Sequence, residues 1–290
     1  MHSHSIFSLL PVLYVLAPGS SAERMLPSNL QVDLIFPRDN ETYAPTQLFP
    51  IVFGISNLDA AWPLNIRLSA QVESLGIPLS MENRPLWATQ YADLGFADLA
   101  EAFAKDPRRY FFHFSAVNMT NGTTDTYQIL WDVVIPRECF AGNSSSVENN
   151  VGVAWSDAPS GYGSRYITFS TAPRAQLPDI EATLSLCQTR NGNNSAAVRI
   201  TKVKSAPSTS DPCPVLDRNV KLEKCIFQSA AKELAANVSA ELLGEMRCDK
   251  GDWRTITTPC PKENMGLQQS AGISVRWLLQ ALVFSILAVL

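Results

Sequence analysis

The feature that most constrains the fold is a succession of short runs rich in β-branched and aromatic residues, separated by clusters of Pro, Gly, Asn and Asp. Such runs are typical of successive β-strands. They lie at 31–36, 50–56, 64–72, 110–117, 126–135, 151–156, 164–171 and 196–203. In the third run, Leu68 and Ala70 alternate with Arg67 and Ser69. Because alternation gives one buried and one wet face, the sequence predicts a mainly β fold, an antiparallel immunoglobulin-like β-sandwich.

One segment interrupts this pattern. In residues 91–105, the apolar residues Leu94, Ala97, Leu99 and Phe103 recur at roughly helical intervals. The spacing predicts a short helix in a loop of the sandwich, ending before a proline.

A Ser/Pro-rich stretch, 205–214, follows the last predicted strand. Its composition is typical of a linker, so we expect it to divide a β-sandwich domain, 23–204, from a Cys-rich helical segment, 213–260. An apolar stripe in that segment predicts one amphipathic helix. The stripe consists of Phe227, Ala231, Leu234, Val238 and Leu242.

The chain contains six cysteines, an even number that predicts a disulfide framework in an exported protein. They are Cys139, Cys187, Cys213, Cys225, Cys248 and Cys260. The first two fall in or beside predicted strands, and we expect them to pair with each other. A helix between Cys225 and Cys248 would hold them roughly 30 Å apart, too far for a disulfide. The favoured tail pairing is Cys213–Cys225 with Cys248–Cys260, and the crossed pairing Cys213–Cys248 with Cys225–Cys260 is the alternative.

Both ends of the chain are apolar. The run at 6–17 is followed by small residues before Glu23, which predicts a secretory signal peptide over 1–22. The run at 277–290 would span only about 21 Å as a helix, too short to cross a bilayer comfortably. With a polar spacer before it, this tail predicts a glycosylphosphatidylinositol (GPI) signal. Asn264 is the favoured attachment site, with 265–290 as the removed propeptide, and Ser270 is the alternative.

Six Asn-x-Ser/Thr sequons are present and predict N-glycosylation in an exported chain. They begin at Asn40, Asn118, Asn121, Asn143, Asn193 and Asn237. Together with the cysteines and the two ends, they predict an extracellular protein on the outer face of the plasma membrane or in the cell wall, bound to the membrane through a GPI anchor.

The sequence argues against several kinds of chemistry. After signal removal His113 is the only histidine, so metal sites built from two or three imidazoles are excluded and no cofactor is expected. A serine hydrolase would have to use His113, which we instead place on a solvated or edge face of a strand. Paired carboxylates for glycoside hydrolysis are conceivable, and Asp132 and Asp157 are the acidic residues nearest aromatic neighbours.

The charge balance argues against a nucleic-acid partner. The predicted mature chain has 22 basic and 27 acidic residues, a net charge of −5, and phosphate-binding faces carry a basic excess. Sugar binding is the better prediction for the sandwich, since flat aromatic rings offer an apolar face to a sugar ring. The candidate platform consists of Trp131, Trp155, Tyr162 and Tyr166. A tryptophan in a sandwich strand is, however, more often part of the core.

The block VDLIFPRDNETYAPTQLFPIVF, residues 32–53, resembles the first block of a family of uncharacterised secreted fungal proteins defined by a domain of unknown function. The family block has the form V-D-L-x-F-P-x-N-x-T-Y-x-P-x-x-x-x-P-I-V-F. Here Arg38 and Asp39 precede Asn40, which keeps the sequon and shifts the spacing. The resemblance also covers a cysteine-containing tail segment and a C-terminal anchor signal. The resemblance implies export and association with the wall or membrane. Because the family's domain has no known function, no catalytic or binding residue can be assigned from it.

These observations lead to one expectation and one alternative. We expect a non-enzymatic, GPI-anchored surface glycoprotein that acts in cell-wall organisation, adhesion or glycan contact, with cell-wall polysaccharide as a candidate partner. The alternative is a secreted carbohydrate-active enzyme that uses paired carboxylates.

Overall fold

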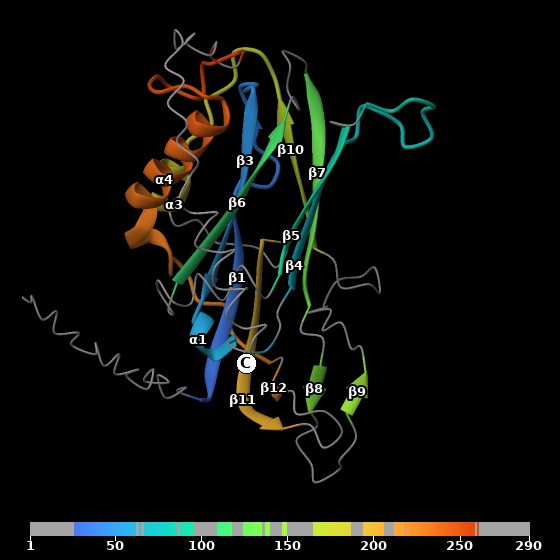
Figure 1. The fold of residues 1–290 in the computed structure, drawn as a ribbon, viewed down its shortest axis with the longest axis vertical. Coiled ribbons are helices and arrows are strands. Elements are labelled where there is room, and N and C mark those ends of the chain that lie inside the picture. The colour runs from blue at the N-terminus through green and yellow to red at the C-terminus, as the bar shows by residue number, and fades with distance from the viewer. Residues whose placement is uncertain are drawn as a thin grey trace, which may run out of the picture.

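A computed structural model gives the fold of the chain (Figure 1). It describes residues 26–61, 64, 67–85, 88–95, 109–117, 124–134, 137–139, 147–149, 165–186, 194–205, 212–217, 219–258 and 260. Two five-stranded sheets share one hydrophobic core. The predicted fold class is confirmed: the chain is a mainly β sandwich with a small, disulfide-stabilised helical segment at its C-terminal side.

Sheet A has the strand order β12-β11-β1-β3-β6, and all its pairs are antiparallel. Its strands are β1 (Ser28–Phe36), β3 (Leu48–Ser56), β6 (Arg109–Val117), β11 (Ser195–Ser205) and β12 (Pro212–Asp217). The first and last long strands are neighbours, since Val32 of β1 lies opposite Ala196 of β11. The N-terminal and C-terminal parts of the chain therefore build the same sheet.

Sheet B has the order β2-β10-β7-β4-β5, with a single parallel pair between β2 and β10. Its strands are β2 (Thr42–Tyr43), β4 (Arg67–Ser74), β5 (Thr89–Leu94), β7 (Asp125–Val134) and β10 (Arg165–Thr171). A separate hairpin pairs β8 (Arg137–Cys139) with β9 (Val147–Asn149). Each predicted run in the described part contains or overlaps a strand, and the predicted strand at 151–156 lies outside the described residues.

The core between the sheets is rich in aromatic side chains. Phe49 of sheet A stacks on Phe169 of sheet B with ring centroids 4.9 Å apart, and Tyr127 stacks on the same ring at 5.2 Å. Along β7 the buried residues alternate with partly exposed ones. This alternation gives sheet B one face toward the core and one face toward solvent, as predicted for a sandwich.

Sheet A, in contrast, is covered on its outer face as well. Gln31 and Asp33 point away from the inner core and are nevertheless buried, because the C-terminal part of the chain lies over them. The Gln31 side chain donates to the carbonyl of Glu223 and accepts from its N–H, at 3.0 and 2.8 Å. These bonds satisfy a polar side chain that burial would otherwise destabilise.

Four helical elements complete the described fold: α1 (Leu58–Ala61), α3 (Ile180–Ser185), the 3₁₀ turn η2 (Gln228–Ala230) and α4 (Ala231–Glu245). All five residues of the predicted apolar stripe are buried, so the amphipathic helix is confirmed. Phe227 comes so near Gly54 of β3 that a Cβ on Gly54 would lie 2.8 Å from its ring. The stripe thus packs directly on the outer face of sheet A (Figure 1).

Two expectations about organisation are corrected. Residues 212–217 were expected to belong to a linker and a separate tail, but they form β12 and pair with β11. Helix α4 packs in the same core as the sandwich, because its buried stripe covers sheet A. The predicted helix at 91–105 is wrong over its first turn, since Tyr91–Leu94 belong to β5 and pair with β4. Residues 96–105 lie outside the described residues.

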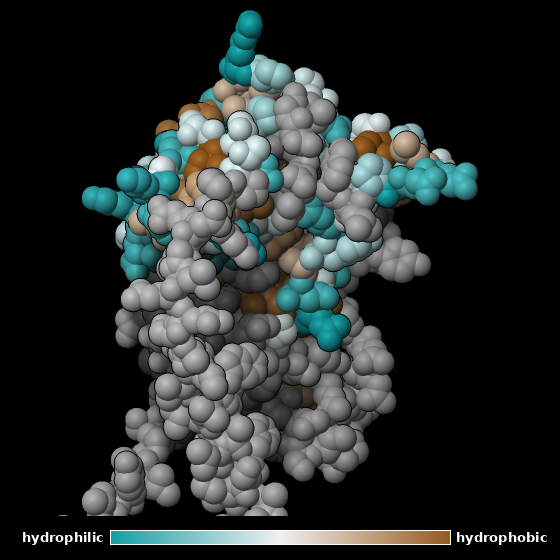
Figure 2. All heavy atoms as spheres, turned by 45° about the horizontal axis from the view of Figure 1, so that its top comes forward, coloured by the Kyte–Doolittle hydropathy of each residue, from teal (hydrophilic) through white to brown (hydrophobic). Residues whose placement is uncertain are grey.

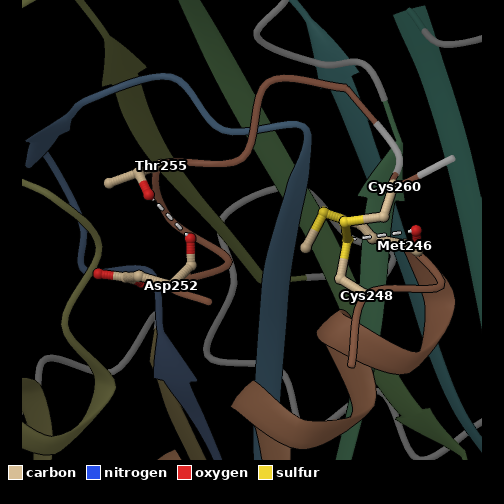
Figure 3. Close-up of a disulfide and its surroundings, with 5 residues drawn as sticks. All are labelled: Met246, Cys248, Asp252, Thr255 and Cys260. Carbon is tan, nitrogen blue, oxygen red and sulfur yellow. Dashed lines mark hydrogen bonds between the residues drawn. A yellow bond between two sulfur atoms is a disulfide. The ribbon is translucent and has the colours of Figure 1, made fainter. Parts of the chain in front are cut away.

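One disulfide joins Cys248 to Cys260, with Cα atoms 5.2 Å apart (Figure 3). Next to it, the N–H of Cys260 donates to the carbonyl of Met246 at 3.1 Å. The Cys248–Cys260 disulfide confirms this part of the favoured pairing and excludes the crossed pairing. Cys213 and Cys225 are also disulfide-bonded, and the pairing among the remaining four cysteines stays a prediction.

Candidate functional site

The outer face of sheet B is the part of the sandwich where aromatic and acidic side chains meet solvent. The strand registers place four residues in one row across the sheet. From β10 to β5 the row consists of Tyr166, Leu130, Gln71 and Tyr91. The two tyrosines are well exposed, at 50 % for Tyr166 and 73 % for Tyr91. We call this row the tyrosine row.

A second row lies beside it and is acidic. Asp132 of β7 and Asp93 of β5 each stand opposite Ser69 of β4, which lies between them. The Ser69 hydroxyl donates to Asp93 Oδ1 at 2.5 Å. Since neighbouring strands are about 4.8 Å apart, the two carboxyl-bearing residues lie roughly 10 Å apart at their backbones. We call this second row the carboxylate row.

The electrostatics of the carboxylate row raise the pKa of Asp132. Partial burial raises the pKa of Asp132 above its usual value, and the charge of Asp93 raises it further, while Arg67 opposes both. Within the described part of the chain, the buried Oδ1 atom of Asp132 makes no hydrogen bond. A carboxyl group in this state can donate a proton to a bound molecule at a higher pH than an ordinary aspartate.

The carboxylate row and the part of the tyrosine row from Leu130 to Tyr91 line one shallow hollow of about 270 Å³, and Tyr166 lies outside it. The strands β4, β5 and β7 supply its walls, and it holds both carboxyl groups and Tyr91. The described residues that line it are Ser69, Ala70, Gln71, Tyr91, Ala92, Asp93, Leu130, Trp131 and Asp132. An apolar ring beside hydrogen-bonding groups on an open sheet is suited to a flat, hydroxyl-rich ligand.

The predicted platform is corrected at one position and extended at another. Trp131 is only 2 % exposed and packs edge-on against Phe53 at 5.5 Å, so its ring belongs to the core and cannot carry a ligand. Tyr166 lies on the outer face as predicted. Trp155 and Tyr162 lie outside the described residues. Tyr91 is an addition to the platform, because it falls in a segment whose apolar spacing predicts a helix, whereas it lies in the edge strand β5.

His113 has a structural contact. Its Nε2 atom lies 3.2 Å from Glu241 Oε2 of α4, and two residues along β6 the Ser115 hydroxyl donates to Glu245 at 3.2 Å. The strand is at the edge of sheet A, as expected for His113, but its outer face meets helix α4 and not open solvent. Asp157, the other acidic residue considered, lies outside the described residues.

A second hollow, of about 470 Å³, lies between α3, α4 and the loop around Trp253. Three of its charged groups, Asp179, Asp252 and Arg254, already bond within the protein. Arg254 binds Asp252 at 2.8 Å, which lowers the pKa of Asp252. Asp179 caps the start of α3 by accepting from Ala182 N–H at 2.8 Å. These bonds hold α3 and the loop around Trp253 in place, and the hollow has no exposed aromatic ring in its described lining.

The remaining predicted sites divide between described and undescribed residues. Asn40 and Asn237 are exposed, which leaves room for a glycan at each. Asn118, Asn121, Asn143 and Asn193 lie outside the described residues, as do Asn264, Ser270 and both apolar ends. Within the described ranges there is no group of three potential metal ligands and no helix long and apolar enough to span a membrane.

Comparison with known proteins gives one match. A family model described as a domain of unknown function (DUF7136) matches residues 25–256. No curated protein and no solved structure matches the chain. The matched range extends from β1 through α4 to Ile256, so it includes both the sandwich and the helix that covers it.

Proposed function

Because the chain belongs to the DUF7136 family, whose domain has no known function, we propose its role from its own surface: a glycan-binding glycoprotein tethered outside the cell. The tyrosine row and its hollow would bind a polysaccharide of the cell wall. The tether would be the predicted GPI anchor near Asn264. The role is one of contact or organisation, without cleavage of the polysaccharide.

The observation that carries this proposal is the exposure of Tyr91 and Tyr166 at the two ends of one row. An exposed tyrosine in a sheet has no partner for its ring face, and a sugar ring can supply one. The row crosses four strands, so its ends are about 14 Å apart at the backbone. This span fits a segment of an extended polysaccharide better than a single sugar. Leu130 and Gln71 fill the row between the two rings with one apolar and one hydrogen-bonding side chain.

Retention on immobilised β-glucan, chitin and mannan tests the proposal. We expect the wild-type protein to be retained on at least one of them. The double variant Tyr91→Ala/Tyr166→Ala should bind that polysaccharide roughly tenfold or more weakly, since each ring contributes on the order of 1 kcal/mol. Leu186→Ala is the matched control, because Leu186 is an exposed apolar residue directly after α3, a helix that packs against α4 and β1. No retention on any of the three, or unchanged retention of the double variant, would refute the proposal.

A second candidate function is supported by the carboxylate row. Asp132 has a raised pKa and shares a hollow with Asp93, which are features of a general acid and its partner in glycoside hydrolysis. If this alternative holds, the bound polysaccharide gains new reducing ends over time. Asp132→Asn should then abolish their release while leaving retention in place. Asp249→Asn, which changes an exposed carboxylate on the loop after α4, is the control. Retention without any new reducing ends favours binding alone.

The tether has its own test. Phosphatidylinositol-specific phospholipase C should release the protein from membranes of cells that express it. Replacing Asn264 with a bulky residue should block attachment at that site. Unimpaired attachment in this variant would move the site to Ser270, and failure of the enzyme to release a membrane-bound protein would argue against a GPI anchor.

A further inference from the structure

Apolar side chains project into solvent from the loop that joins β4 to β5. Leu79 is 73 % exposed, Met81 51 % and Leu75 49 %. The segment 75–81 contains no charged residue. Isolated exposed leucines are ordinary, but a concentration of them on one projecting loop marks an interaction surface. We call residues 75–81 the apolar loop.

The protein holds the loop in shape from behind. The carboxylate of Asp125 accepts from the Ser74 hydroxyl at 2.5 Å and from the Gly76 N–H at 3.0 Å. On the other side, the Arg84 guanidinium donates to the carbonyls of Ser74 and Ala88 at 3.0 and 3.1 Å, and to the Thr89 hydroxyl. These bonds keep the loop ordered while its apolar side chains point outward, so little ordering remains to be done on binding.

The loop lies at the same end of the sandwich as the last described residues. It follows the C-terminal end of β4, next to the start of β7, since Ser74 lies opposite Tyr127. Helix α4 ends at this end too, because Glu245 bonds to Ser115 near the end of β6. In Figure 1 the loop projects at the upper right, and the segment after α4 lies at the upper left. Figure 2 brings this end forward and shows hydrophobic side chains in brown on the projecting arm at the right, beside hydrophilic side chains in teal at its outer tip.

The chain leaves the described structure at this end. Cys260 is fixed there by its disulfide to Cys248 and by its N–H bond to Met246. The favoured anchor site, Asn264, is four residues further on. Four residues reach at most about 14 Å when fully extended. A GPI anchor at Asn264 would therefore keep this end of the sandwich close to the lipid surface.

From these observations we propose that the apolar loop inserts Leu75, Leu79 and Met81 into the outer leaflet of the membrane to which the protein is tethered. The proposal rests on the proposed tether. Residues 75–81 carry no charge, and the exposed Glu82 beside them is acidic. The loop therefore suits a zwitterionic lipid surface such as phosphatidylcholine, because binding to anionic lipids requires a basic cluster. Contact at two points, the anchor and the loop, fixes the orientation of the sandwich on the membrane.

Quenching by lipid measures the insertion directly. The full-length protein is released by phospholipase C or, if no anchor is attached, collected from the medium, and is mixed with phosphatidylcholine vesicles that carry a spin-labelled lipid. A fluorophore is attached to a cysteine introduced as Leu79→Cys or, as the control, Lys232→Cys, at an exposed position near the start of α4. We expect the fluorophore at residue 79 to be quenched several-fold more than the one at residue 232. Equal quenching at both positions, or none at residue 79, would overturn the proposal.

Co-flotation with the same vesicles provides a second measurement. Leu79→Ser/Met81→Ser should weaken binding on the order of tenfold or more, from the loss of two partly inserted side chains, and Leu186→Ser should leave it unchanged. Both loop residues are exposed, so the variant keeps the core intact. Light scattering without lipid tests a second copy as the occupant: if wild type is a dimer and the loop variant a monomer, the loop is a protein interface and the lipid proposal is wrong.

The outcomes separate this inference from the proposed function. The loop variant should keep full retention on polysaccharide, and Tyr91→Ala/Tyr166→Ala should keep full binding to vesicles. Quenching at residue 79 in a protein that phospholipase C does not release would support the loop and refute the tether. Release without quenching would support the tether and refute the loop.

Discussion

At the scale of single residues, the contact between Gly54 and Phe227 shows how closely the C-terminal segment fits the sandwich. Gly54 lies in the middle of β3, where a side chain would point toward α4. An added Cβ would come within 2.8 Å of the Phe227 ring and 2.9 Å of Ile35 Cδ1. Phe227 also packs edge-on against Phe111 of β6 at 5.3 Å. The Phe227 ring therefore occupies the space that a side chain at position 54 would need.

We expect Gly54→Ala to lower the free energy of unfolding by about 1–3 kcal/mol, because the close-packed ring and Ile35 leave no room for a methyl group. Denaturant unfolding followed by circular dichroism measures the change.

Gly244→Ala is the matched control, since a Cβ at Gly244 of α4 meets no atom within 4 Å. It should raise stability by roughly 0.5–1 kcal/mol, as expected for alanine in place of glycine in a helix. Equal effects of the two substitutions would contradict the packing explanation.

The candidate site shows which residues sequence reasoning can reach. Alternation places Tyr166 on the outer face, because its neighbour Ile167 is buried in the core. The same rule, applied to β7, puts Trp131 on the inner face with Tyr127 and Ile129. An aromatic residue in a strand is thus not evidence of a platform until its side of the sheet is known. Asp93 and Asp132 are 39 positions apart in the sequence, and only the pairing of β4 with both β5 and β7 brings them together.

At the scale of elements, the long strands were predictable and the short or polar ones were not. Runs such as 126–135 have enough β-branched and alternating residues to be recognised alone. The strand β5 has the sequence TQYADL, which carries little β propensity. This segment forms a strand because it pairs with the backbone of β4 at the edge of sheet B. Tertiary context therefore overrides the local sequence preference. The helix α4 was predictable because the residues of its apolar stripe recur at helical intervals in the sequence, and all of them are buried against sheet A.

Element contacts also allow a prediction of the remaining disulfides. Strand β8, which contains Cys139, packs against β12, which contains Cys213. Ser185 lies two residues before Cys187, and Gln228 lies three residues after Cys225. The Gln228 side chain donates to the Ser185 carbonyl at 2.8 Å, so the segments next to these two cysteines are in contact. A disulfide requires Cα atoms within about 7 Å. We therefore expect Cys139–Cys213 and Cys187–Cys225, in place of the pairs expected from the sequence.

Mass spectrometry of proteolytic peptides without reduction tests this expectation. The peptide with Cys139 should remain joined to the one with Cys213, and the peptide with Cys187 to the one with Cys225. A linked peptide containing Cys139 and Cys187 would contradict it. The Cys248–Cys260 pair serves as the internal control for recovery of intact disulfides.

At the scale of the whole molecule, the sandwich and the C-terminal helix form one structural unit. The buried side of α4 belongs to the same hydrophobic cluster as the strands of both sheets, and the match to the family extends over both parts. A sequence-based division at a Ser/Pro-rich stretch could not show this, because composition reports local flexibility and not what the next segment packs against.

A single cooperative unfolding transition is therefore expected. Leu242 of α4 is fully buried, and Leu242→Ala should lower the stability of the whole domain by about 2–5 kcal/mol, through lost burial and the cavity left behind. Calorimetry and circular dichroism of the sheets should shift together. Lys232→Ala, at an exposed position of the same helix, should change stability by less than about 0.5 kcal/mol. Two separate transitions, with the sheet signal unaffected by Leu242→Ala, would contradict the single unit.

The pairing of the first long strand with one of the last has a consequence for the order of synthesis. Val32 needs Ala196 as its neighbour, and the outer face of sheet A needs Leu242 to cover it. A ribosome has to make nearly the whole domain before these contacts can form, and contacts so distant in sequence form slowly. The growing chain thus carries strongly apolar segments such as 48–55 without their final partners. We therefore expect those segments to need protection by chaperones until the domain is complete.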